Sequence, residues 1–119
     1  MLVAVMSVAL LSQTVVADDP AVANREAIVI CLRNMAARAQ RFYHTSLSEG
    51  GGSGSFAVLT WINLISHPLN AYGSFSLVAP SAANVTLVGT GVETGNDGAT
   101  PVQAVAVVYS DSVIVMVYN

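Results

Sequence analysis

The chain has 119 residues, the size of one small domain; 54% of them are hydrophobic and 9% are charged, against about 25% charged residues in an ordinary soluble protein. Seven acidic residues against four arginines, with no lysine, give a formal net charge of −3, so the basic surface needed to bind nucleic acid is missing. One cysteine excludes an internal disulfide, and two histidines do not make a zinc finger. We therefore expect no cofactor, no structural metal and no nucleic-acid partner.

Residues 1–17 form an uncharged, mostly apolar segment. Its polar side chains are Ser7, Ser12, Gln13 and Thr14. As an α-helix the segment would span roughly 26 Å, slightly less than the ~30 Å hydrocarbon core of a bilayer. A secretory signal peptide has similar hydrophobicity but opens with positive charge, whereas the first basic residue here is Arg25. We expect the segment to stay in the mature protein, with Met1 left after removal of a short basic leader.

A helix boundary or kink is predicted near Pro20. Aspartate caps helices and proline suits the first helical position, so Asp19-Pro20 separates residues 1–19 from the rest. Residues 21–45 then predict an amphipathic helix with apolar side chains at spacings of three and four. This stripe comprises Ile28, Cys31, Leu32, Met35, Ala39 and Phe42. The arginines concentrate towards the end of the helix, where its dipole favours them.

Two segments without clear periodicity follow this helix. Residues 48–55 contain a glycine run and predict a loop; no lysine follows the glycines, which excludes a phosphate-binding P-loop. Residues 56–69 include Trp61 and Pro68 and predict either a short helix or an irregular packed segment.

The C-terminal part of the chain predicts two β-hairpins. Residues 74–79 and 84–89 are short strands joined by a turn at 80–83, and residues 102–109 and 112–118 are β-branched or aromatic with a turn between them. The glycine-rich residues 90–101 predict a loop. The fold class is therefore α+β, with a long N-terminal helix packed on a four-stranded antiparallel sheet.

The last predicted strand, residues 112–118, is apolar on both faces. One face is expected to pack on the amphipathic helix and the other to meet something else, for which a partner subunit is the simplest candidate.

No pattern of catalytic residues is present, so we do not expect an enzyme. No serine lies in a nucleophile elbow, and His44 and His67 are isolated. Cys31 lies on the apolar stripe and is interpreted as a core residue rather than a reactive thiol.

Two binding or modification patterns stay open as minor alternatives. The carboxylates and amide of Glu93, Asn96 and Asp97 offer oxygen ligands for Ca²⁺, although the spacing is typical of a turn. Residues 84–86 fit the N-glycosylation pattern but fall in a predicted strand.

The order of these elements resembles the type IV pilins and pseudopilins of bacteria. A group of short pilin-like proteins is similar in residues 23–28, Ala-Asn-Arg-Glu-Ala-Ile, and in Asn34-Met35-Ala36 of the following helix. The glycine run ending at Phe56 and residues 89–98, Gly-Thr-Gly-Val-Glu-Thr-Gly-Asn-Asp-Gly, are also similar to that group.

The resemblance implies a structural subunit of an extracellular filament on the cell surface. Residues 1–19 would lie in the inner membrane before assembly and then pack with identical subunits in the filament core, while residues 20–119 would form a pilin-like globular domain. The implied core residues are Met1, Leu2, Val3, Val5, Met6, Val8, Leu10, Leu11, Val15 and Val16, and the helix break is at Asp19 and Pro20. The alternative function is a monomeric membrane-anchored or secreted binding module.

The chain departs from the pilin pattern in two places. Many pilins have glutamate at the fifth residue, where this chain has Val5. Many also close a C-terminal loop with a disulfide, whereas Cys31 lies in the predicted helix. The C-terminal loop would then be held by packing and hydrogen bonds alone.

Overall fold

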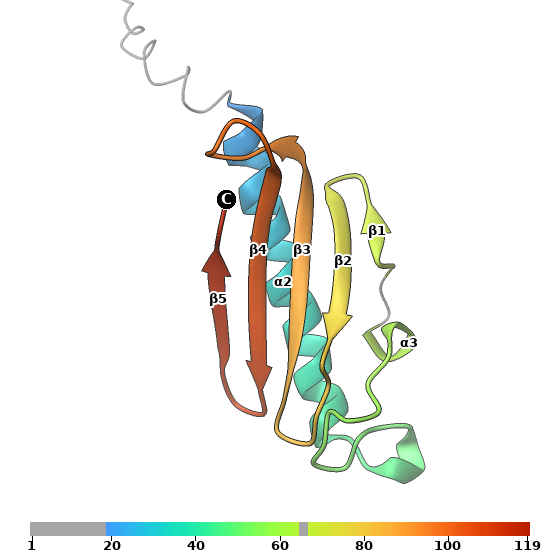
Figure 1. Ribbon diagram of the computed structural model, residues 1–119. Coiled ribbons are helices and arrows are strands. Elements are labelled where there is room, and N and C mark those ends of the chain that lie inside the picture. The colour runs from blue at the N-terminus through green and yellow to red at the C-terminus, as the bar shows by residue number, and fades with distance from the viewer. Residues whose placement is uncertain (1–18, 65–66) are drawn as a thin grey trace, which may run out of the picture.

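A computed structural model of the chain describes residues 19–64 and 67–119. It is an α+β structure in which one long helix lies on one face of an antiparallel sheet (Figure 1). The helical elements are α2 (Pro20–His44), η1 (Leu47–Glu49) and α3 (Trp61–Leu64). The strands are β1 (Leu69–Asn70), β2 (Gly73–Val78), β3 (Asn84–Thr94), β4 (Pro101–Tyr109) and β5 (Val113–Val117).

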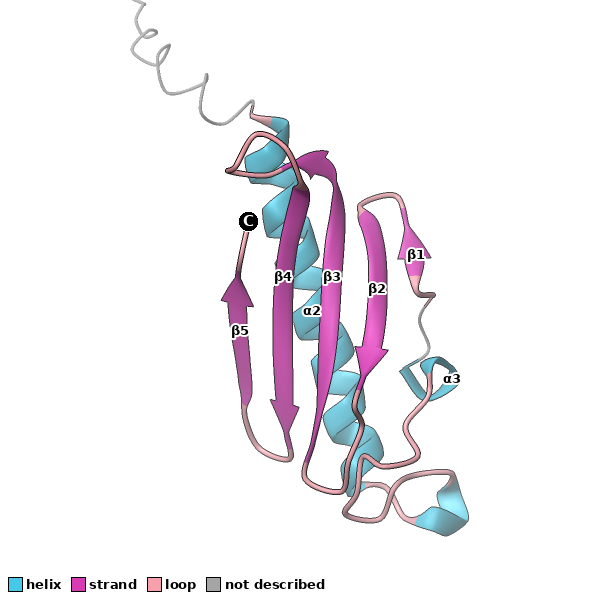
Figure 2. Ribbon diagram, viewed as in Figure 1, coloured by secondary structure: helices cyan, strands magenta, loops and turns pink. Residues whose placement is uncertain are grey.

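The sheet is a simple meander. Each strand pairs antiparallel with the next in sequence, giving the spatial order β1-β2-β3-β4-β5. The short connections place the turn between β2 and β3 and the turn between β4 and β5 at the same end of the sheet (Figure 2). The loop between β3 and β4 lies at the other end, beside the start of α2.

Both ends of α2 are fixed by local chemistry. The Asp19 side chain accepts a hydrogen bond from the backbone N–H of Ala21 at 2.9 Å, and Pro20 is the first helical residue. At the other end Thr45 has extended backbone, and its hydroxyl donates to the carbonyl of Arg41 at 2.6 Å. The short helix η1 that follows ends separately at Gly50, whose φ of 89° is a left-handed conformation that glycine adopts without strain. Helix α2 is therefore a single 25-residue element.

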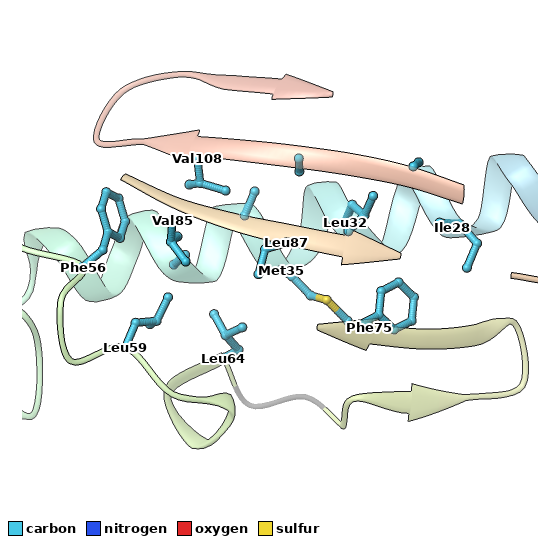
Figure 3. Close-up of a cluster of buried hydrophobic side chains, with 14 of the residues drawn as sticks. Ile28, Leu32, Met35, Phe56, Leu59, Leu64, Phe75, Val85, Leu87 and Val108 are labelled. Atoms are coloured by element: carbon cyan, nitrogen blue, oxygen red, sulfur yellow. The ribbon is translucent and has the colours of Figure 1, made fainter. Parts of the chain in front are cut away.

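The core lies between α2 and the sheet (Figure 3). The helix buries a stripe consisting of Ile28, Leu32, Met35, Ala36, Ala39 and Phe42. It meets buried side chains of β3 and β4, among them Val85, Leu87 and Val108, while Phe56, Leu59 and Leu64 close one end of the core. Each large aliphatic side chain buried in this way contributes roughly 1.5–3 kcal/mol.

Small residues on the sheet let the helix come close. Ala104 and Ala106 of β4 are fully buried. A Cβ at Gly89 of β3 would lie 2.7 Å from the Cγ2 atom of Ile28, so glycine leaves the space that Ile28 occupies. Burial alternates along β3 and β4, so only one face of each strand packs on the helix.

The predicted number of four strands was wrong. The structure adds β1, a two-residue strand in which Leu69 pairs with Ser74 and Asn70 with Gly73. Asn70 makes the turn itself, because its side-chain oxygen accepts hydrogen bonds from the N–H groups of Tyr72 at 2.8 Å and Gly73 at 3.2 Å.

The predicted loop at residues 90–101 was also too long. Strand β3 continues to Thr94, and Pro101 already begins β4, so the connecting loop is confined to residues 95–100. The pairing register shifts between Thr90 and Thr94, which marks an irregularity in the strand. Gly91 contributes to the loop-like composition of this stretch, but it lies within β3 and makes room for the Asn24 side chain of α2.

Strand β5 is apolar on both faces, but only one of them is partly covered. Val113 and Val115 pack against the core, whereas Ile114 and Met116 are 51% and 37% exposed. One face of β5 therefore packs against the core between the sheet and α2, as expected for this strand.

This difference gives a matched pair of substitutions. Val115→Asp should lower the free energy of unfolding by about 1–3 kcal/mol, because it places a charge on the half-buried face. Ile114→Asp, on the exposed face of the same strand, should change it by less than about 0.5 kcal/mol. Denaturant unfolding followed by circular dichroism measures both values. Equal losses of stability in the two variants would contradict the assignment of the faces.

Candidate functional site

The residues implied for the filament core lie within residues 1–18 and are outside the described residues. The described chain begins with Asp19 and Pro20, which form the start of α2. Among the helices of the described ranges, none is long and apolar enough to cross a membrane. Residues 19–64 and 67–119 likewise contain no group of three or more His, Cys, Asp or Glu side chains that could hold a metal ion.

The face of α2 opposite the core is a second functional candidate. We call it the outer stripe and define it as Ala23, Glu26, Ile30, Arg33, Ala37 and Arg41. These residues follow one another at spacings of three and four, so they share one side of the helix. All of them are exposed, and Ile30 is 59% exposed although it is a large apolar residue.

The charged residues of the outer stripe are available for contacts. Within the described part of the chain, Glu26, Arg33 and Arg41 make no hydrogen bond or ion pair through their side chains. The nearby His44 differs, because its Nε2 atom lies 3.5 Å from the Asp111 carboxylate and 3.2 Å from the carbonyl oxygen of Ser110.

A shallow apolar groove lies beside the outer stripe. Its lining consists of Arg25, Glu26, Val29 and Ile30 of α2 and Val117 of β5. Val117 is 48% exposed because α2 covers the middle strands of the sheet better than the edge strand β5. The helix face and the sheet edge are thus continuous apolar surface at this point.

The last residue of the sequence is tied to α2 and to the loop between β3 and β4. Arg25 donates from Nη2 to the side-chain oxygen of Asn96 and to the carbonyl of Asn119, both at 3.0 Å. The Asn119 amide donates in turn to the carbonyls of Thr100 at 2.9 Å and Pro101 at 2.8 Å. Hydrogen bonds therefore connect this end of the sheet to the helix without a disulfide.

Asp97 organises the same loop. Its carboxylate accepts hydrogen bonds from the backbone N–H groups of Ala99 at 2.9 Å and Thr100 at 2.8 Å, and from the Thr100 hydroxyl. The hydroxyl bond and these backbone bonds hold the pKa of Asp97 well below its usual range. With the Asn96 oxygen bonded to Arg25, two of the three groups considered for Ca²⁺, Asn96 and Asp97, make hydrogen bonds that shape the loop.

Asn24 is a structural residue that the sequence analysis missed. It is the buried polar side chain of α2, 6% exposed, and it donates to the carbonyl of Tyr72 at 2.8 Å. Its oxygen accepts from the N–H of Glu93 at 3.2 Å, so it joins the helix to both β3 and the turn before β2. A Cβ at Gly91 would lie 2.0 Å from that oxygen, which explains the glycine.

Cys31 is a half-buried free thiol on α2. Its sulfur accepts a weak hydrogen bond from the Asn70 side chain at 3.7 Å, next to the β1–β2 turn. Cys31 thus lies at the edge of the buried stripe of α2, where it is partly buried against the core.

Comparisons with known proteins add no relative: no protein-family model matches the chain, nor does any curated protein or solved structure.

The low pKa of Asp97 predicts a specific pH dependence. Because the folded state favours the ionised carboxylate, Asp97 adds stability at pH values above the ordinary aspartate pKa of about 4, and this contribution is lost as the pH falls below it. Asp97→Asn keeps the shape and one acceptor but does not titrate. Thermal unfolding followed at pH 7 and pH 2 should show a larger fall in Tm for the wild type than for this variant. The same fall in both proteins would show that Asp97 does not contribute.

Proposed function

We propose that the chain is a structural subunit of an extracellular type IV pilus-like filament built from identical copies. The observation that supports this most directly is the position of α2. Its first residue, Pro20, follows immediately after the uncharged, apolar residues 1–17 and the two aspartates. The apolar segment and the helix that supports the globular domain are therefore consecutive parts of one chain.

The composition of residues 1–17 requires burial. An apolar segment without charge is stable in a bilayer or against other apolar helices, and each buried methylene contributes about 0.8 kcal/mol. Moving such a segment from lipid into a bundle of identical helices keeps it buried. Copies that point in the same direction and touch through two different surfaces make heterologous contacts, which produce an open filament when they do not close into a ring.

The rest of the domain is consistent with display on a filament. The inward side of α2 is fully used by the sheet, and the sheet itself is closed against the helix by an apolar core. The domain therefore does not need residues 1–17 to cover its core, which leaves that segment available for contacts between copies. The competing function, a monomeric anchored or secreted binding module, uses the same segment only as an anchor.

Deletion of residues 1–17 tests the proposal. We expect loss of filaments and release of a folded soluble monomer, because the core begins at Asn24 and Ile28 of α2. Electron microscopy of material sheared from producing cells shows the filaments, and circular dichroism with size-exclusion chromatography shows the monomer. Truncated protein that still forms filaments of normal diameter would contradict the proposal; a full-length chain that forms no filaments would favour the anchored module.

A point substitution provides a finer test of the same segment. Val8→Arg should prevent assembly, because a central arginine costs about 2.5–3.5 kcal/mol on membrane insertion scales and is repeated in every copy. Val8→Leu is the matched control and should assemble normally. Normal filaments from the arginine variant would indicate that this part of the chain is not buried.

A further inference from the structure

We propose that the cavity at the C-terminal end of α2 binds a small hydroxylated carboxylic acid of the uronic acid type, that is, a sugar that carries one carboxyl group. The inference goes beyond the proposed filament and does not depend on it. The cavity lies between the end of α2, the loop that follows and α3, and its volume is about 240 Å³. Pockets for drug-sized ligands have roughly 300–1,000 Å³, so this cavity suits a molecule about as large as one sugar.

The glycine-rich loop after α2 forms one wall of the cavity and is held by backbone hydrogen bonds. The N–H of Gly52 donates to the carbonyl of Phe42 at 2.9 Å. The N–H of Ser53 donates to the carbonyl of Thr45, also at 2.9 Å. A Cβ at Gly52 would lie 2.7 Å from the Phe42 ring, so the loop packs closely on the helix end. The wall is therefore formed before any ligand binds.

Two arginines of α2 give the cavity positive charge. Arg38 and Arg41 are three residues apart and line it from the same side of the helix. Arg38 is held in place by a hydrogen bond from its Nη1 atom to the carbonyl of Leu64 at 3.4 Å. Arg41 is exposed, and its guanidinium makes no hydrogen bond or ion pair with residues 19–64 or 67–119. The planar fork of N–H groups on such a guanidinium matches a carboxylate.

Glu49 and Asn63 supply the other polar groups of the cavity. Glu49 of η1 lines the same space as Arg41, yet it forms no ion pair with any side chain of the described residues. Asn63 of α3 accepts hydrogen bonds through its side-chain oxygen from the N–H and the hydroxyl of Thr60, at 2.9 and 3.0 Å. This orientation leaves the Asn63 amide nitrogen without a partner in the described part of the chain. The cavity thus offers donors on one side and an acceptor on the other.

The balance of charge selects the class of ligand. Two guanidinium groups and one carboxylate give the cavity a net charge of +1, in a chain with a formal net charge of −3. One carboxylate on the ligand neutralises this charge, and hydroxyl groups on the same ligand donate to Glu49. An amino acid fits less well, because its ammonium group cancels the charge of its carboxylate. A phosphate monoester, with about two negative charges, would be repelled by Glu49.

Titration of the full chain in neutral detergent micelles with sodium galacturonate tests the site. Trp61 is the single tryptophan of the chain and lies in α3, two residues before Asn63, so its fluorescence reports on this cavity. Galacturonate should change the fluorescence in a saturable way, with a Kd of about 1 mM for a ligand of this size. No saturable change with galacturonate would overturn the inference, while the proposed filament would stand or fall separately.

Related compounds at equal ionic strength show which groups are recognised. Galactose lacks the carboxylate and acetate lacks the hydroxyls, so each should bind at least about tenfold more weakly than galacturonate. Equal binding of either compound would overturn the proposed ligand class. The same acid occurs free and in acidic polysaccharides. Digalacturonate that binds as tightly as the monomer would assign the site to polysaccharides, and monomer binding alone would assign it to free acids; both results support the shared chemistry.

Substitutions at the cavity complete the test. Arg41→Gln should weaken galacturonate binding by about tenfold or more, because it removes the charged donor. Arg33→Gln removes the same charge from an exposed position of α2 outside the cavity and should bind like the wild type. Glu49→Gln should reduce the preference for galacturonate over acetate, because the charged acceptor for the hydroxyls is lost. Circular dichroism checks that all three variants are folded. Equal weakening by Arg41→Gln and Arg33→Gln, or an unchanged preference in Glu49→Gln, would overturn the inference.

Discussion

The contact between α2 and the two middle strands of the sheet is the interaction on which the rest of the structure depends. The stripe from Ile28 to Phe42 is buried against β3 and β4. The small residues Gly89, Ala104 and Ala106 on these strands leave room for the helix to come close. This close approach excludes water from the core. It matters here because a small domain buries a smaller fraction of its surface on folding than a large one. The described residues contain one cysteine, which is a free thiol, so packing and hydrogen bonds replace a covalent link.

The same contact divides α2 into two sides with different chemistry. One side packs on the sheet. On that side, Asn24 also forms hydrogen bonds with the backbone of Tyr72 and Glu93, which fix the position of the helix along the sheet. The helix is therefore held firmly in translation and rotation. Its outer stripe is consequently presented in a fixed orientation.

The sequence predicted those parts of the fold whose signal is periodic. Helical spacing over residues 21–45 predicted the helix that the structure places at Pro20–His44. The short run at residues 74–79 predicted β2, and the β-branched and aromatic runs predicted β4 and β5, each within one or two residues of its bounds. The failures have tertiary causes. Gly91 weakens the local strand signal, but it is needed because the Asn24 side chain occupies the space of a Cβ. The two residues of β1 are too few to show any period, and their turn is made by the Asn70 side chain.

The distribution of charge makes α2 the part of the domain that can orient a neighbour. All four arginines of the chain are in this helix, and the outward side chains of β2, β4 and β5 are uncharged. A second copy that rests on the sheet can bury apolar area there, but burial is non-directional and tolerates sliding. Opposite charges at fixed positions do distinguish one register from the next. In a chain with 9% charged residues, Glu26, Arg33 and Arg41 therefore give directional character to the face of α2 that is turned away from its own sheet.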